Sequence, residues 1–158
     1  MKKLLFLAGL ICFALLLQGC STTTVTLADG SQEEVSGRLV DLGNGICQDV
    51  LTGQMWQQTR SKRLHSIDDA KDYVNTIELG GYDDWRLPTV AELYDLHLFF
   101  DIHENGTCQI KTKGNYWSDE PDAEGRVGSW EMDENCDPER QYIPKQAGRV
   151  RVVRDVVK

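Results

Sequence analysis

The N-terminal twenty residues constrain this chain most strongly. Lys2 and Lys3 precede residues 4–17, which carry no charge, and the segment ends in Leu17-Gln18-Gly19-Cys20. The apolar run suits the central part of a secretory signal peptide and is shorter than the about 20 residues that a membrane-spanning helix needs. The ending has the order that lipoprotein signal peptidase cleaves, although an ordinary signal peptide that precedes a cysteine by chance is the alternative. We therefore predict that residues 1–19 are a lipoprotein signal peptide and that Cys20 is lipidated.

Lipidation would determine where the rest of the chain lies. Two or three acyl chains make a durable anchor, whereas one chain binds only reversibly. We therefore expect a lipid-anchored protein of the cell envelope, and Ser21 after the cysteine favours the outer membrane. Residues 20–36, rich in Ser, Thr and acids, are predicted to be a lipidated cysteine and a flexible tether. Residues 37–158 are then one domain.

The charge of the chain argues against one class of partner. The formal net charge is −8, and removal of the signal peptide with its two lysines makes the mature chain still more acidic. Such a chain repels polyanions, so we predict no nucleic-acid partner. After the signal peptide, the sequence contains no apolar run long enough to span a membrane. The lipid is therefore the predicted membrane contact.

The cysteines fit an oxidising compartment. Cys12 leaves with the signal peptide and Cys20 is the lipidation site, so Cys47, Cys108 and Cys136 remain for pairing. All three pairings are open. We favour Cys108–Cys136, which would contribute roughly 3–4 kcal/mol on the chain-entropy model. Cys47 would then be free and buried, or would pair between molecules.

The order of predicted elements indicates an α+β domain. Local signals favour a strand at 38–42, a hairpin at 46–58 and three later strands at 116–118, 129–132 and 148–153. In the last strand the valines and the arginines occupy opposite sides. Ser66 and Thr89 are predicted to cap two helices, the second through a capping box with Glu92. Gly80 is the predicted C-terminal glycine of the first helix.

Several of these segments together resemble a known family. They are Thr52-Gly53-Gln54-Met55-Trp56, Gly81-Tyr82-Asp83-Asp84-Trp85-Arg86-Leu87-Pro88-Thr89 with Glu92-Leu93, Tyr116-Trp117-Ser118, and Val150-Arg151-Val152-Val153-Arg154. In this order they resemble the Lcl C-terminal domain family over about residues 42–154. The resemblance implies a C-type-lectin-like fold, with two helices near the N-terminal half and short antiparallel strands. It implies a binding domain more readily than a catalyst, although fold alone does not give function.

The D-W-R-L-P-T segment has a structural interpretation. Trp85 and Leu87 are expected to be core residues between the two helices, since both are large and apolar. Arg86 is expected to pair with a nearby acid or with backbone carbonyls. This interpretation makes the segment part of the fold and not a ligand contact.

Acidic residues gather between positions 119 and 139, where Arg126 is the single basic residue. Carboxylate oxygens at short spacing suit calcium, and C-type-lectin-like folds often hold calcium in a long loop. Calcium is therefore a candidate cofactor, with Asp119, Glu120, Asp122 and Asp133 as its candidate ligands. The alternative is a solvated acidic loop that the basic C-terminal stretch partly balances.

The sequence offers little support for catalysis. His65, His97 and His103 lack zinc-binding spacing, and no nucleophile or phosphate-binding motif is present. We therefore predict that the chain is not an enzyme. One hypothesis is a binding module for a glycan or protein, with a ligand surface that contains Trp117, Trp130, Asp119 and Glu120. The other is a structural lipoprotein that docks on another envelope protein. Exposed tryptophans in a groove would favour the first, and two buried tryptophans beside a flat apolar patch would favour the second.

Overall fold

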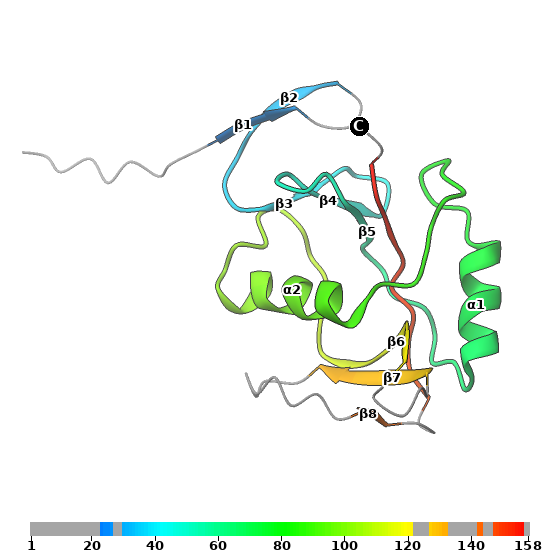
Figure 1. Ribbon diagram of the computed structural model, residues 1–158. Helices are drawn as coiled ribbons and strands as arrows, with labels where there is room; N and C mark the ends of the chain where they lie inside the picture. Colours follow the sequence, from blue (N-terminus) through cyan, green and yellow to red (C-terminus); the bar gives the residue numbers. More distant parts are fainter. Residues whose placement is uncertain (1–22, 27–29, 122–126, 133–141, 144–146, 157–158) are drawn as a thin grey trace, which may run out of the picture.

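A computed structural model describes residues 23–26, 30–121, 127–132, 142–143 and 147–156 (Figure 1). The elements in chain order are β1 (Thr23–Thr26), β2 (Gln32–Val35), β3 (Leu39–Asp41), β4 (Ile46–Asp49), β5 (Met55–Gln57), α1 (Ile67–Thr76), α2 (Val90–Asp101), β6 (Gly114–Pro121), β7 (Val127–Met132), β8 (Tyr142–Ile143) and β9 (Val153–Arg154). The strands form three antiparallel sheets, ordered β1-β2, β3-β4-β5-β9 and β6-β7-β8. This mixed arrangement confirms the predicted α+β class.

The β4–β5 hairpin is the centre of the four-stranded sheet. Its register pairs Cys47 with Trp56, and the turn contains Gly53 at φ 80°, a conformation that glycine adopts without steric cost. Asp49 stabilises the same turn, because its Oδ1 accepts from Leu51 N at 3.0 Å and its Oδ2 accepts from the Thr52 hydroxyl at 2.8 Å. The hairpin predicted from the sequence is therefore confirmed.

Helix α1 begins where the sequence predicts but ends earlier. The Ser66 hydroxyl accepts from Asp69 N at 3.0 Å, as expected for an N-cap. Apolar side chains of the helix pack into the core, with Ala70 fully buried. The predicted end at Gly80 is wrong: Ile77 is already extended at ψ 125° and is the C-cap. Gly80 lies instead in a turn whose ends, Leu79 and Tyr82, form a β-bridge.

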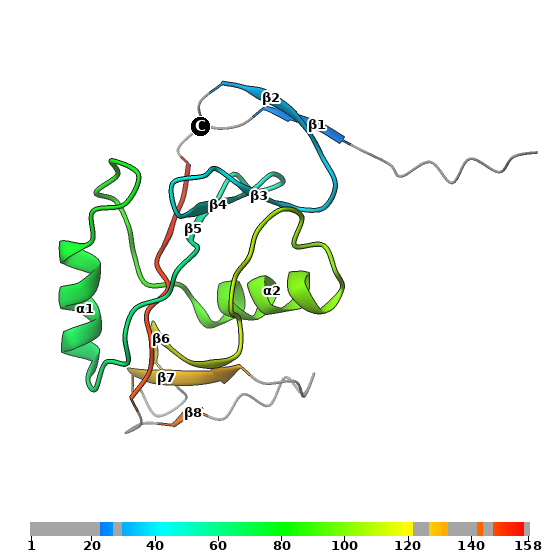
Figure 2. The ribbon, with the colours of Figure 1, turned by 180° about the vertical axis from the view of Figure 1, so that it is seen from behind.

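Helix α2 lies between the β3-β4-β5 sheet and the β6-β7 pair in both views of the molecule (Figures 1 and 2). Its N-terminus has the predicted capping box: Thr89 Oγ1 accepts from Glu92 N at 3.1 Å, and Glu92 Oε2 accepts from Thr89 N at 2.7 Å. Leu93 and Leu96 of this helix are buried. The helix is therefore enclosed on two sides by sheets.

The C-terminal segment 147–156 joins the parts of the domain. Arg149 makes a parallel bridge with Tyr116 of β6, Val153 bridges Arg86, and β9 pairs with β5. Val150, Val152 and Val153 are fully buried, so two-sided burial explains why the apolar–polar alternation breaks at Val153. This segment therefore connects β5, β6 and the residues just before α2.

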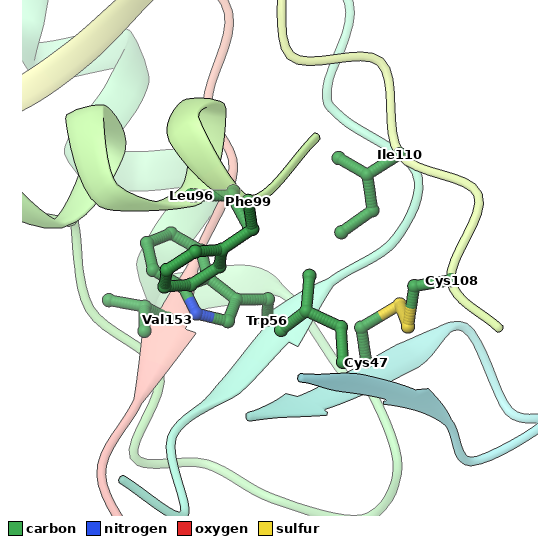
Figure 3. Packing of buried hydrophobic residues seen from close by; sticks show 8 residues of the cluster. Cys47, Trp56, Leu96, Phe99, Cys108, Ile110 and Val153 are labelled. Carbon is green, nitrogen blue, oxygen red and sulfur yellow. A yellow bond between two sulfur atoms is a disulfide. The ribbon is translucent and has the colours of Figure 1, made fainter. Parts of the chain in front are cut away.

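The disulfide links the hairpin to the loop after α2. Cys47 bonds to Cys108, and both side chains are fully buried in a core cluster with Trp56 and Phe99 (Figure 3). The predicted Cys108–Cys136 pair is therefore wrong in its partner, and Cys136 lies outside the described residues. The reason is tertiary: Thr107 Oγ1 accepts from Asp41 N at 2.9 Å, which holds the loop against β3 and beside Cys47 on β4.

Part of the predicted tether is structured. β1 and β2 pair over four residues each, from Thr23 opposite Val35 to Thr26 opposite Gln32. The TTVT sequence has high strand propensity, and Gly30, at φ 84°, lies in the connection between the two strands. The prediction of a flexible segment here is wrong for these two stretches. Cys20 and the signal peptide lie outside the described residues.

Candidate functional site

The structure places the predicted tryptophan surface largely inside the molecule. Trp117 is 3 % exposed and its Nε1 donates to Leu64 O at 3.4 Å. Trp130 is half-buried and packs against Leu93 and Tyr116. The prediction that Trp117 is exposed to ligand is wrong, since its ring lies in a core cluster with residues of α1 and of the C-terminal segment.

The two acids of this surface that the structure describes have protein partners. Asp119 is exposed and lies 3.1 Å from Lys71 Nζ. Glu120 Oε2 accepts from Val90 N at 2.8 Å, which satisfies one of the unpaired donors at the start of α2. Asp122 and Asp133, the other candidate calcium ligands, lie outside the described residues. Within the described ranges, no three His, Cys, Asp or Glu side chains are close enough together to hold a metal ion.

The D-W-R-L-P-T segment has the structural role that the sequence indicated. Trp85 and Leu87 are buried. Arg86 donates to both carboxylate oxygens of Glu92, at 2.6 and 2.9 Å, and to Asp155 Oδ2 at 2.9 Å. Its side chain thus joins the start of α2 to the chain just after β9. These contacts give the segment a structural role at the start of α2.

A different group of residues surrounds a cavity of about 470 Å³. Its lining comes from three segments that are far apart in the sequence: Gln58, Thr59 and Arg60 after β5; Gln109 and Lys111 after the disulfide; and Arg149 and Arg151 of the C-terminal segment. Every lining residue is polar, and four of the seven are cationic. The volume falls in the range of small-ligand sites.

Arg151 forms the buried side of this pocket. It is 1 % exposed, and its guanidinium donates to the backbone carbonyls of Gln57, Gln58 and Lys111. Burial lowers the pKa of this guanidinium from its ordinary value, since the charged form loses hydration. Three carbonyl dipoles hold the charge in place without neutralising it.

The pocket's cations are connected through one tyrosine. Arg60 Nη1 donates to the Tyr116 hydroxyl at 2.8 Å and to Lys113 O at 2.6 Å. The same hydroxyl donates to Lys111 O, which also accepts from Arg151 Nη2 at 2.9 Å. Arg149 Nη1 donates to Ser61 O at 2.9 Å. Backbone oxygens and one hydroxyl therefore orient the three guanidinium groups.

Other arginines of the domain are paired differently. Arg38 makes a two-bond contact with Asp49, Arg86 with Glu92, and Arg154 with Asp84, each at 2.6 to 2.9 Å. Among the described residues, no carboxylate pairs with Arg60, Lys111, Arg149 or Arg151. Positive charge is thus concentrated in the pocket of a protein whose net charge is −8.

The sequence contained a partial signal for this pocket. The alternation in Val150-Arg151-Val152 predicted that the arginines lie opposite the valines, and the structure confirms this, because the valines are in the core and the arginines line the pocket. Burial of Arg151 was not expected. Arg60 and Lys111 carried no signal, because only the fold brings their segments to the C-terminal one.

The family assignment now rests on a direct comparison. Residues 45–154 match the model of the Lcl C-terminal domain, so the chain belongs to this family. The match includes all seven residues of the pocket. No curated protein and no solved structure gives a significant match to the chain. In the parts of the chain that the structure describes, no helix has the length and apolar character to cross a membrane.

Proposed function

We propose that this chain is a cell-envelope lipoprotein whose C-type-lectin-like domain is a binding module for a glycan or a protein, and not an enzyme. In this proposal the lipid on Cys20 anchors the chain in the membrane, most simply the outer membrane because Ser21 follows. The signal-peptide sequence supports the anchor. The binding role rests on one observation, the polar pocket of about 470 Å³ between three segments.

The pocket suits binding better than it suits catalysis. Its lining has hydrogen-bond donors and cations, but among the described residues it contains no histidine, carboxylate or thiol, the groups that most often act as bases or activated nucleophiles. Hydrogen bonds to backbone oxygens orient the guanidinium groups, and oriented donors hold a ligand at low entropic cost. Trp117 is buried and Trp130 is half-buried, so this proposal puts the ligand site in the pocket and not at the tryptophans.

An array of glycans and matrix proteins tests this proposal. The full chain, purified in a non-denaturing detergent, is applied in calcium and again in chelator. Saturable binding that Lys111→Glu abolishes would support a binding module that uses the pocket. The matched control is Lys62→Glu, because Lys62 is exposed, carries the same charge and lies outside the pocket lining.

The other outcomes have equally definite meanings. Binding that both variants retain would contradict the pocket as the site. No binding in either buffer would contradict the proposal and favour the alternative, a structural lipoprotein that docks on another envelope protein. Loss of binding in chelator alone would move the site toward the acidic residues 119–139.

A further inference from the structure

Within the part of the chain that the structure describes, the pocket has four cations and no carboxylate to balance them. Arg60, Lys111, Arg149 and Arg151 all line it, and no described carboxylate lies within ion-pair distance of any of them. A buried charge without a counterion is costly. A ligand that brings a negative charge would therefore be bound more strongly than a neutral ligand of the same shape.

The arrangement of the charges indicates the kind of anion. Guanidinium groups match the two oxygens of a carboxylate or phosphate in a planar, two-bond geometry. Three backbone carbonyls hold Arg151, whereas Arg60 and Arg149 contact the described residues through Nη1 alone. The remaining N–H groups of these side chains are donors for an oxyanion.

The neutral residues of the lining indicate the rest of the ligand. Gln58, Thr59 and Gln109 bring amide and hydroxyl groups, which both donate and accept hydrogen bonds. Ring hydroxyls of a sugar need this combination. The volume of about 470 Å³ lies in the range of small-ligand sites and has room for a sugar unit.

We propose that the pocket binds a sugar-sized polyhydroxylated ligand through one oxyanion group, a carboxylate or a phosphate, held by Arg60, Arg149, Arg151 and Lys111. This proposal rests on the proposed binding function and specifies its ligand class. The site is for a single charged group. An extended polyanion would meet the negative field of the whole protein, whose net charge is −8.

Calorimetric titration of the full chain in detergent tests the ligand class. Galacturonate represents the carboxylate, galactose 6-phosphate the phosphate, galactose the neutral sugar, and dextran sulfate the extended polyanion. We expect at least one of the two acidic sugars to bind about tenfold or more tightly than galactose, in line with a charge-assisted hydrogen bond. The affinity should fall as salt is raised, because the contact is ionic. The preferred acid identifies the oxyanion.

Two variants locate the contact. Lys111→Gln is expected to weaken binding of the preferred acid about tenfold and to leave the chain folded, since Lys111 is exposed and its side chain has no structural partner among the described residues. Lys62→Gln is the matched control and should change nothing. Arg149→Lys keeps the charge but loses the planar fork, so it should weaken acid binding while the circular dichroism spectrum stays the same.

Each contrary result has a separate meaning. Equal affinity for galactose and both acids would overturn the oxyanion site but leave the binding module intact. Binding of dextran sulfate with no binding of either acidic sugar would overturn the single-charge site. Equal effects of Lys111→Gln and Lys62→Gln would show that general charge, and not the pocket, controls binding. Silence of all four ligands would overturn this inference, while the array of immobilised glycans and proteins still decides the binding function.

Discussion

Glu92 offers the sharpest test of the forces that hold the domain together. Its two carboxylate oxygens accept from Arg86 at 2.6 and 2.9 Å, from Thr89 N at 2.7 Å and from Gln54 Nε2 at 2.7 Å. One side chain thus joins the D-W-R-L-P-T segment, the start of α2 and the β4–β5 hairpin. Burial by itself raises the pKa of Glu92, but the hydrogen bonds, led by those from Arg86, outweigh it and lower the pKa to about 2.

We expect Glu92→Gln to reduce the free energy of unfolding by about 2 kcal/mol near neutral pH. The difference between the ordinary pKa of 4.5 and about 2 corresponds to about 3 kcal/mol in full. The Arg86 side chain is 37 % exposed, so water and salt screen the pair and reduce its contribution. Glutamine keeps the size of the side chain but removes the charge.

The same pKa predicts how the effect depends on pH. A carboxylate whose pKa is lower in the folded state stabilises the protein above its unfolded pKa, near 4.5, and loses this contribution as the pH falls toward 2. The difference between the wild-type chain and Glu92→Gln should therefore be complete at about pH 7 and reduced to less than half at about pH 3. Urea unfolding followed by far-UV circular dichroism measures both values.

The control for this experiment is Glu78→Gln. Glu78 is an exposed acid between the two helices, so its replacement changes the net charge equally and should leave stability within about 0.5 kcal/mol. If Glu78→Gln destabilised as much as Glu92→Gln, the network around Glu92 would not be the cause. A Glu92→Gln effect of the same size at both pH values would also refute the argument, because an ion pair must lose its contribution on protonation.

Three further predictions concern the disulfide, the loop after α2 and the anchor. Replacement of Cys47 by serine should cost about 4 kcal/mol of stability on the chain-entropy model, since the bridge spans 61 positions. Peptide mapping of the unreduced wild-type chain should recover Cys47 joined to Cys108. Recovery of either cysteine joined to Cys136 would contradict the structure. Gly106→Ala should destabilise by more than about 2 kcal/mol in urea unfolding, because Gly106 has φ 56° and a Cβ there would lie 2.1 Å from a carbonyl oxygen of β3. Gly43 has φ 82° with open space around it, so Gly43→Ala should cost about 1 kcal/mol. Equal costs for the two variants would show that the close contact at Gly106 is not the cause. Cys20→Ser should abolish incorporation of labelled fatty acid and release the chain from membranes, and a variant that stays labelled would contradict the predicted anchor.

Local sequence signals were sufficient wherever neighbours in the sequence determine the structure. The turn at Gly53, the N-cap at Ser66 and the capping box of Thr89 with Glu92 depend on contacts within a few residues, and all three are confirmed. The family could also be identified from the sequence, because its motifs, such as the one that contains Asp84-Trp85-Arg86, are short and local. These motifs follow one another along the chain in the order that the family has. The signal peptide and the lipid on Cys20 are also local in sequence, and they stay predictions.

The disulfide, the buried Trp117 and the pocket could be decided only by the tertiary structure. Cys108 has Cys47 as its partner because the loop after α2 docks on β3, a contact between residues that the sequence holds far apart. The alternation of the last strand placed Arg149 and Arg151 on one side, but it could not tell whether that side faces water or protein. Lys111 and Arg60 join them because two other segments fold against the same strand. The sequence thus determines which side of a strand is polar, and only packing between distant segments determines what that side encloses.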